Sequence, residues 1–219
     1  GLGKAVEAGV WGRQLVDKDP MVPVLYRAPA RLVPNVASEM RDKLGIGARR
    51  WVAGNTIDAR LESDRVVIAS IHKAAFGKHL DLVAQSGPWD AIIVDECHHL
   101  SDWDPTGGKP NQAFRLVSQL VKAQPDGGRL ILMSGTPHQG SEARFKNILR
   151  LLSDDGKSVS GAAGRVIYRT KDRVRDWRGA PLFPSRDIRQ PVVVQLGDHY
   201  VQWYLAIGAL YDGVGQNGV

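Results

Sequence analysis

The stretch AIIVDECHHL (residues 91–100) sets an apolar strand directly against two carboxylates. Its β-branched residues predict a strand covered on both faces, of the kind that lies inside a parallel sheet. Open α/β sheets place catalytic groups at the carboxyl ends of their strands. Asp95 could therefore hold Mg²⁺, and Glu96 could orient and deprotonate a water that attacks a γ-phosphate. A solvated strand end followed by a polar turn is the alternative interpretation.

Short apolar runs alternate with longer helical patterns on either side of this stretch. The alternation is typical of strand-helix-strand units and predicts an α/β fold, with a mostly parallel sheet covered by helices on both faces. Strands are predicted at residues 22–28, 65–70, 90–96, 129–135 and 190–196. Helices are predicted at residues 4–15, 31–43, 73–84, 111–123 and 142–152, with Asn111 and Ser141 as caps of the last two.

The chain opens on GLGKAVEAGV (residues 1–10), which matches the end of a phosphate-binding loop. Gly1 and Gly3 would let backbone N–H groups approach phosphate oxygens, Lys4 would reach the terminal phosphates, and the next helix would point its positive end at the anion. Ala5 stands where such a loop carries a hydroxyl that contacts Mg²⁺. A chance Gly-Lys pair at a helix start is the alternative.

A second strand end, RLILMSGTPHQG (residues 129–140), delivers Ser134, Gly135 and Thr136 to a tight turn at the same sheet edge. Hydroxyls there can hydrogen-bond the Asp-Glu strand and couple the nucleotide state to bound nucleic acid. An ordinary strand-to-helix turn capped by Ser or Thr is the alternative.

A zinc site is a competing interpretation of Cys97, His98 and His99, because all three side chains can bind zinc. Adjacent residues project in different directions, however, and no second cysteine or separated histidine pair completes a set of four ligands. The sequence therefore favours the carboxylates over a metal centre of this kind.

Composition predicts a globular protein, since 219 residues with 43% hydrophobic content can bury a core. A net charge of +6 favours contact with a polyanion, although a merely basic surface is the alternative. Cys97 is the only cysteine, which precludes an internal disulfide and favours a reducing, cytoplasmic setting. No apolar run approaches the roughly 20 residues that span a bilayer, and no secretory signal is visible, so no membrane partner is expected.

Together, and in this order, the motifs resemble the first RecA-like lobe of superfamily 2 helicases, specifically the Swi/Snf-type ATPases and their bacterial relatives associated with RNA polymerase or phage defence. The similar segments are GLGKAVEAG (1–9, motif I), APARLVPNV (28–36, motif Ia), IASIHKAAF (68–76, motif Ib), DECH (95–98, motif II) and SGTPHQG (134–140, motif III). The basic run YRTKDRVRDWRGAPLFPSR (168–186) is similar to a segment that follows motif III in the same group.

The resemblance implies a RecA-like P-loop NTPase lobe over residues 1–160, with ATP and Mg²⁺ as cofactors, and a basic extension over residues 161–219 that leads toward a second lobe. It also implies that the first strand and the start of the phosphate loop precede Gly1. The second lobe would supply arginines that stabilise the transferred phosphoryl group, so residues 1–219 alone are expected to hydrolyse ATP poorly.

The resemblance further implies contacts with the nucleic-acid backbone from the turns of motifs Ia and Ib. The candidates are Arg31, Asn35, Ser70, His72 and Lys73, and ordinary solvated loops are the alternative. Five of the six tryptophans are expected to anchor the core or loops rather than to stack on bases; they are Trp51, Trp89, Trp103, Trp177 and Trp203.

The leading functional hypothesis is an ATP-dependent motor that moves on duplex DNA and remodels a protein complex. One alternative is a strand-separating helicase or the motor subunit of a restriction system, which would use the same motifs. Another is a DNA-binding or scaffolding module with a decayed ATP site. Ala5 favours the scaffold, whereas retention of Lys4, Asp95 and Glu96 opposes it.

Overall fold

The computed structural model describes residues 4–51, 65–70, 86–103, 108–137, 141–153, 159–184, 190, 192, 195 and 197–216. The chain divides into two compact units, residues 1–166 and residues 167–219. The first unit contains the sheet with the predicted motifs, and the second contains a basic hairpin and a long helix.

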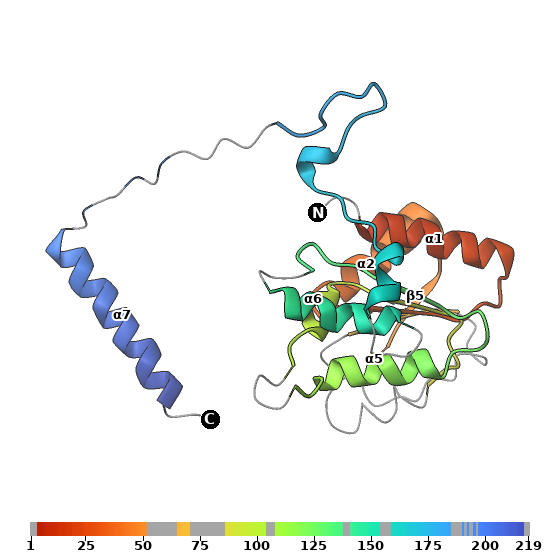
Figure 1. The fold of residues 1–219 in the computed structure, drawn as a ribbon, viewed down its shortest axis with the longest axis horizontal. Helices are drawn as coiled ribbons and strands as arrows, with labels where there is room; N and C mark the ends of the chain where they lie inside the picture. Colours follow the sequence, from red (N-terminus) through yellow and green to blue (C-terminus); the bar gives the residue numbers. More distant parts are fainter. Residues whose placement is uncertain are drawn as a thin grey trace. The chain divides into compact units, whose positions relative to one another are not determined.

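The described strands form one five-stranded sheet in the order β2-β3-β1-β4-β5, and every described pair is parallel (Figure 1). The strands are β1 (Val24–Ala28), β2 (Ala48–Arg50), β3 (Val66–Ser70), β4 (Ala91–Val94) and β5 (Arg129–Leu132). Four predicted strands are thus confirmed as β1, β3, β4 and β5. The predicted α/β class is also confirmed, with an all-parallel rather than a mostly parallel sheet.

Helices cover both faces of the sheet, and Figure 1 shows α1 and α2 on the side opposite α5. The α-helices are α1 (Lys4–Lys18), α2 (Val33–Leu44), α5 (Gln112–Lys122), α6 (Glu142–Leu149) and α7 (Asp198–Gln216). The short 3-10 helices are η1 (Cys97–Leu100), η2 (Arg150–Leu152), η3 (Ser160–Arg165) and η4 (Lys171–Arg173).

Alternating side chains of each strand enter two separate cores. On β4, Ile92 and Val94 pack with residues of α5 and α6, whereas Ala91 and Ile93 pack with residues of α1 and α2. The period of two residues in an extended strand produces this division. The sequence predicts burial on both faces for β1, β3, β4 and β5, because each is apolar at successive positions. The prediction is confirmed for β1, β3 and β4 and is wrong for β5.

Side-chain and backbone caps set the ends of the helices. Asn111 Oδ1 accepts a hydrogen bond from Phe114 N (2.8 Å) at the start of α5, and Ser141 Oγ accepts one from Arg144 N (3.4 Å) at the start of α6. Both predicted caps are confirmed. Helix α2 ends at Gly45, whose φ of 62° is the left-handed conformation that glycine adopts without steric cost.

One strand was not predicted, and three expectations from the sequence have other outcomes. Strand β2 was not predicted, because three residues with two arginines give no apolar signal for an edge strand. Strand β5 is only half-buried, since the described sheet pairs it with β4 alone. The predicted helix 73–84 lies outside the described residues. Of the predicted strand 190–196, only residues 190, 192 and 195 are described, and none of these lies in a strand.

The tryptophans divide into buried and exposed side chains. Trp89 is buried, and Trp51 and Trp103 pack against the same core, as predicted. The prediction is wrong for Trp177 and Trp203, which are 86% and 70% exposed. Both lie in the second unit, where the described residues provide no comparable core. No described helix meets the length and hydropathy needed to cross a membrane.

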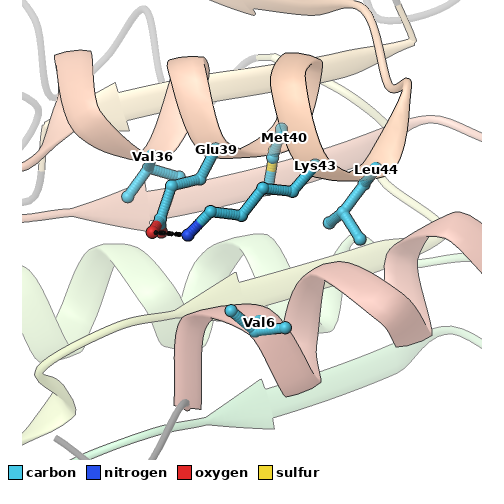
Figure 2. A pocket seen from close by; sticks show the side chains of 6 residues that line it. All are labelled: Val6, Val36, Glu39, Met40, Lys43 and Leu44. Carbon is cyan, nitrogen blue, oxygen red and sulfur yellow. Dashed lines mark hydrogen bonds and ion pairs between the residues drawn. The ribbon is translucent and has the colours of Figure 1, made fainter.

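Helix α1 approaches α2 closely at Gly9. A Cβ at this position would overlap the Leu44 Cδ1, whereas a Cβ at Gly12, one turn further along, would meet nothing within 4 Å. Figure 2 shows the same helix pair, with Val36 and Leu44 of α2 extending toward Val6 of α1 beside the Lys43–Glu39 ion pair. Gly9 therefore allows the two helices to pack together.

We expect Gly9→Ala to lower the free energy of unfolding by about 1–3 kcal/mol, because Leu44 must leave its packed position. Gly12→Ala should raise it by up to about 1 kcal/mol, because alanine favours the helix and clashes with nothing. Urea denaturation of both variants measures the difference. Equal changes of the same sign in the free energy of unfolding of the two variants would show that the close contact of Gly9 with Leu44 does not limit the packing of the helices.

Candidate functional site

Segments far apart in the sequence meet at the carboxyl edge of β4 and β5. Lys4, the first residue of α1, places its Nζ 4.0 Å from Glu96 Oε1. A Cβ on Gly135 would lie only 3.2 Å from the same Nζ, so the glycine leaves space for the lysine. The Lys4 and Glu96 side chains are 26% and 28% exposed, which leaves both within reach of a bound ligand.

Backbone hydrogen bonds to both neighbouring strands hold the acidic pair. Asp95 N donates to Arg27 O (2.8 Å) at the end of β1, and Cys97 N donates to Met133 O (2.8 Å) after β5. Between these anchors, Glu96 adopts φ 49° and ψ 47°, the left-handed conformation. This conformation costs a non-glycine residue about 1–3 kcal/mol and is concentrated at functional sites.

Asp95 is buried, with 6% of its surface exposed. Its Oδ1 accepts a hydrogen bond from Glu96 N (2.8 Å), and its Oδ2 accepts one from the Tyr26 hydroxyl (3.5 Å). Burial raises the pKa of the Asp95 carboxyl, and the nearby Glu96 raises it further, while Lys4 and the hydrogen bonds act in the opposite direction. A cation beside the carboxylate would offset the cost of burying its charge.

His98 connects Glu96 to the turn after β5. Its Nδ1 lies 3.1 Å from Glu96 Oε2 and 3.0 Å from Ser134 Oγ, which also accepts a hydrogen bond from Thr136 N (3.1 Å). A carboxylate can only accept, so Nδ1 can donate to Glu96 in the tautomer that carries its proton there. The predicted acidic pair and the predicted Ser134 turn are therefore physically connected.

His98 and Tyr26 are parts of this arrangement that the sequence did not predict. The sequence predicts His98 as a member of the DECH motif and as a possible zinc ligand, although its place two residues after Glu96 could have suggested a contact. Tyr26 gave no signal, because it looks like any aromatic residue in a buried strand. Burial raises the Tyr26 pKa, with Asp95 adding to the effect, so the hydroxyl stays protonated and can donate.

Cys97 belongs to the hydrophobic core. Burial raises the pKa of its thiol to about 12, and the neighbouring Glu96 contributes to the shift. Zinc needs a thiolate, which this environment disfavours. Within the described ranges, no group of three His, Cys, Asp or Glu side chains is placed to hold a metal ion.

Three predicted nucleic-acid contacts lie along the same edge of the sheet. Arg31 lies in the turn after β1, Asn35 lies in the first turn of α2, and both are exposed. Ser70 ends β3, where it is in register with Ala28, the last residue of β1. Arg31 and Asn35 thus follow β1, and Ser70 ends β3, and these two strands continue the sheet from β4 toward β2.

The structure describes the remaining predicted site residues only in part. Gly1, Gly3, His72 and Lys73 lie outside the described residues. For Ala5 the structure describes the backbone, which lies in the first turn of α1. The hollow between α1 and α2 in Figure 2 contains none of the predicted site residues.

No family model matches the chain. The RNA polymerase-associated protein RapA of Vibrio vulnificus (strain YJ016) is 30% identical over 162 residues, which make up 71% of this chain and 16% of that protein. RapA of Vibrio cholerae serotype O1 (strain M66-2) is 28% identical over 162 residues with the same coverage. The Sulfolobus solfataricus SWI2/SNF2 ATPase core in complex with dsDNA matches the fold with a TM-score of 0.52 at 16% identity, over 75% of this chain and 32% of that chain.

The chain carries a Swi/Snf-type, RecA-like lobe of helicase superfamily 2. The family resemblance indicated by the motifs is thereby confirmed. This Swi/Snf-type lobe accounts for only a small part of RapA, since the matched region covers 16% of the relative's length.

Proposed function

We propose that the Swi/Snf-type lobe binds ATP and couples its hydrolysis to movement along nucleic acid. The observation that carries this proposal is the connected set formed by Lys4, Glu96, His98 and Ser134 at the carboxyl edge of a parallel sheet. The strands that bring Arg31 and Ser70 to the same edge lie beside it. A nucleotide and a nucleic acid bound here would therefore share one rigid sheet.

In this proposal Lys4 binds the terminal phosphates, supported by the backbone of Gly1, Gly3 and Ala5 at the start of α1. Glu96 orients the attacking water and accepts its proton. His98 fixes the orientation of the Glu96 carboxylate by donating to it. The turn Ser134–Gly135–Thr136 responds to changes at Glu96 through His98, which would couple nucleotide state to the rest of the lobe.

The residues present fit a magnesium ion. Asp95 offers carboxylate oxygens, and its buried charge would be stabilised by a cation. Mg²⁺ typically takes only one or two protein carboxylates and completes its shell with water and phosphate oxygens, so Asp95 is sufficient as the main protein ligand. When bound, the ion would neutralise charge on the phosphates during transfer.

We further propose duplex DNA as the track, bound through phosphate contacts from Arg31, Asn35, Ser70, His72 and Lys73. The dsDNA in the Sulfolobus solfataricus complex supports this choice. The name of RapA supports a protein complex such as RNA polymerase as the remodelled target. A second RecA-like lobe in the natural protein would supply the arginines that complete the ATP site.

The test is the rate of ATP hydrolysis with and without duplex DNA, measured on the natural protein that contains residues 1–219. Stimulation by duplex without release of a labelled strand supports a translocase, whereas strand release supports the helicase alternative. DNA binding without ATP hydrolysis would support the alternative of a DNA-binding or scaffolding module, which the absence of a hydroxyl at Ala5 favours.

Ala5→Thr is expected to increase ATP hydrolysis several-fold, because the restored hydroxyl would supply a ligand to Mg²⁺. The effect should be largest at low Mg²⁺ concentration, so a titration of Mg²⁺ in both proteins is the measurement. Ala5→Val provides a control of similar shape without the hydroxyl. If threonine and valine have the same effect, metal coordination at this position is not the limiting factor.

A further inference from the structure

Residues 174–182 form a small, well-defined hairpin in the second unit. Arg175 and Pro181 form an antiparallel bridge, and Leu182 N donates to Val174 O (3.0 Å). At the tip, Gly179 N donates to Asp176 O (3.0 Å), which closes a four-residue turn. Gly179 has a φ of 83°, so the last turn residue uses the freedom of glycine.

The Asp176 side chain organises the tip of the hairpin. Its Oδ1 accepts hydrogen bonds from Arg178 N and Ala180 N, both at 2.9 Å. Aspartate at the first position and glycine at the fourth are the usual residues of such a turn. Local hydrogen bonds thus fix the direction in which Trp177 and Arg178 leave the backbone.

An exposed indole and a guanidinium occupy the tip together. Trp177 is 86% exposed, and Arg178 Cζ lies 4.4 Å from the centre of its ring. The stacked arginine covers part of one ring face and leaves the rest of the indole to solvent. A tryptophan that is 86% exposed on a turn fixed by hydrogen bonds offers a large aromatic surface to a partner, and tryptophan is enriched at binding interfaces.

The surroundings of the hairpin are cationic. Residues 167–184 contain five basic and two acidic side chains, and one of the acidic ones is Asp176 in the turn. Arg173 and Arg175 are exposed on the hairpin itself, and Lys171 lies over the Phe183 ring (Nζ to ring centre 5.6 Å). An aromatic platform within a cationic arm matches the chemistry of a nucleic-acid strand, which presents phosphates and flat bases together.

We propose that this hairpin binds single-stranded nucleic acid, with an unpaired base stacking on Trp177 and phosphates contacting Arg178 and its neighbours. This proposal rests on the proposed function only in taking nucleic acid as the partner. It adds a contact to those already proposed for Arg31 and Ser70. Duplex DNA offers the phosphates but no free base face along its length. The hairpin should therefore contribute to binding of an unpaired strand and little to binding of a duplex.

The experiment measures the affinity of the natural protein that contains residues 1–219 for fluorescent oligothymidylate, oligouridylate and a blunt duplex. Trp177→Ala should weaken binding of the single strands about tenfold and leave duplex binding within twofold. Trp177→Phe should retain most of the affinity, because it keeps an aromatic face. Arg178→Ala should reduce the slope of log affinity against log salt by about 0.7, the value for one phosphate of a single strand.

Trp203→Ala is the matched control, since it removes another exposed tryptophan of the same unit and should change nothing. The proposal would be overturned if Trp177→Ala and Trp203→Ala weakened single-strand binding equally. It would also be overturned if binding of polyglutamate, a polyanion without bases, depended on Trp177. Normal single-strand binding by Trp177→Ala, with DNA-stimulated ATP hydrolysis intact, would overturn the hairpin proposal alone. Absence of DNA-stimulated ATP hydrolysis in the unsubstituted protein would instead count against the proposed function. Comparison of the effects of Trp177→Ala on oligothymidylate and oligouridylate binding shows whether Trp177 prefers DNA or RNA.

Discussion

Glu96→Gln is expected to lower kcat for ATP hydrolysis by about 10²–10⁴-fold, the usual contribution of a general base. The amide keeps the shape of the side chain and its contact with His98 but cannot accept the proton from water. Lys4 loses a nearby negative charge (Nζ to Oε1 4.0 Å), so nucleotide affinity should stay the same or rise. Steady-state kinetics together with fluorescent-nucleotide binding separates the two effects.

Glu142→Gln is the matched control for that substitution. Glu142 lies exposed in the first turn of α6 and pairs with Lys146 (2.8 Å), away from the Lys4–Glu96 cluster. Its replacement should leave kcat unchanged. A Glu96→Gln protein that hydrolyses ATP at the normal rate would remove Glu96 from the mechanism and leave the acidic pair with a structural role.

Trp89→Ala is expected to cost about 3–5 kcal/mol of folding free energy, because it removes a large side chain that is 1% exposed. The indole packs into the core shared by β4 and α5, and its Nε1 donates to Ser86 Oγ (3.1 Å). Domains of this kind are stable by only about 5–15 kcal/mol, so the variant should lose a large part of its stability.

Trp177→Ala provides the comparison, since it also removes an indole but from a side chain that is 86% exposed. Its effect should stay within about 0.5 kcal/mol. Urea denaturation followed by circular dichroism measures both variants. Similar losses for the two would mean that Trp177 is buried in the folded protein in solution.

Much of the sheet could be predicted from local sequence. Strands β1, β3 and β4 are apolar at successive positions, and only a parallel sheet with helices on both faces buries such strands completely. Strand β2 could not be predicted, because its pairing with β3 comes from a neighbour that folds against it and not from its own three residues. The exposure of Trp177 could not be predicted either, because it depends on which other residues of the folded chain pack against the side chain.

The sequence by itself determined the α/β class, the order of the motifs and the candidate residues Lys4, Asp95, Glu96 and Ser134. These follow from strand and helix periodicity and from side-chain chemistry, which are local properties. Only the tertiary structure decided that His98 bridges Glu96 and Ser134, that Tyr26 contacts Asp95 and that Gly135 makes room for Lys4. Apart from the contact of His98 with Glu96, these contacts join residues that are distant in sequence, and the parallel register of β1, β4 and β5 brings them to one edge.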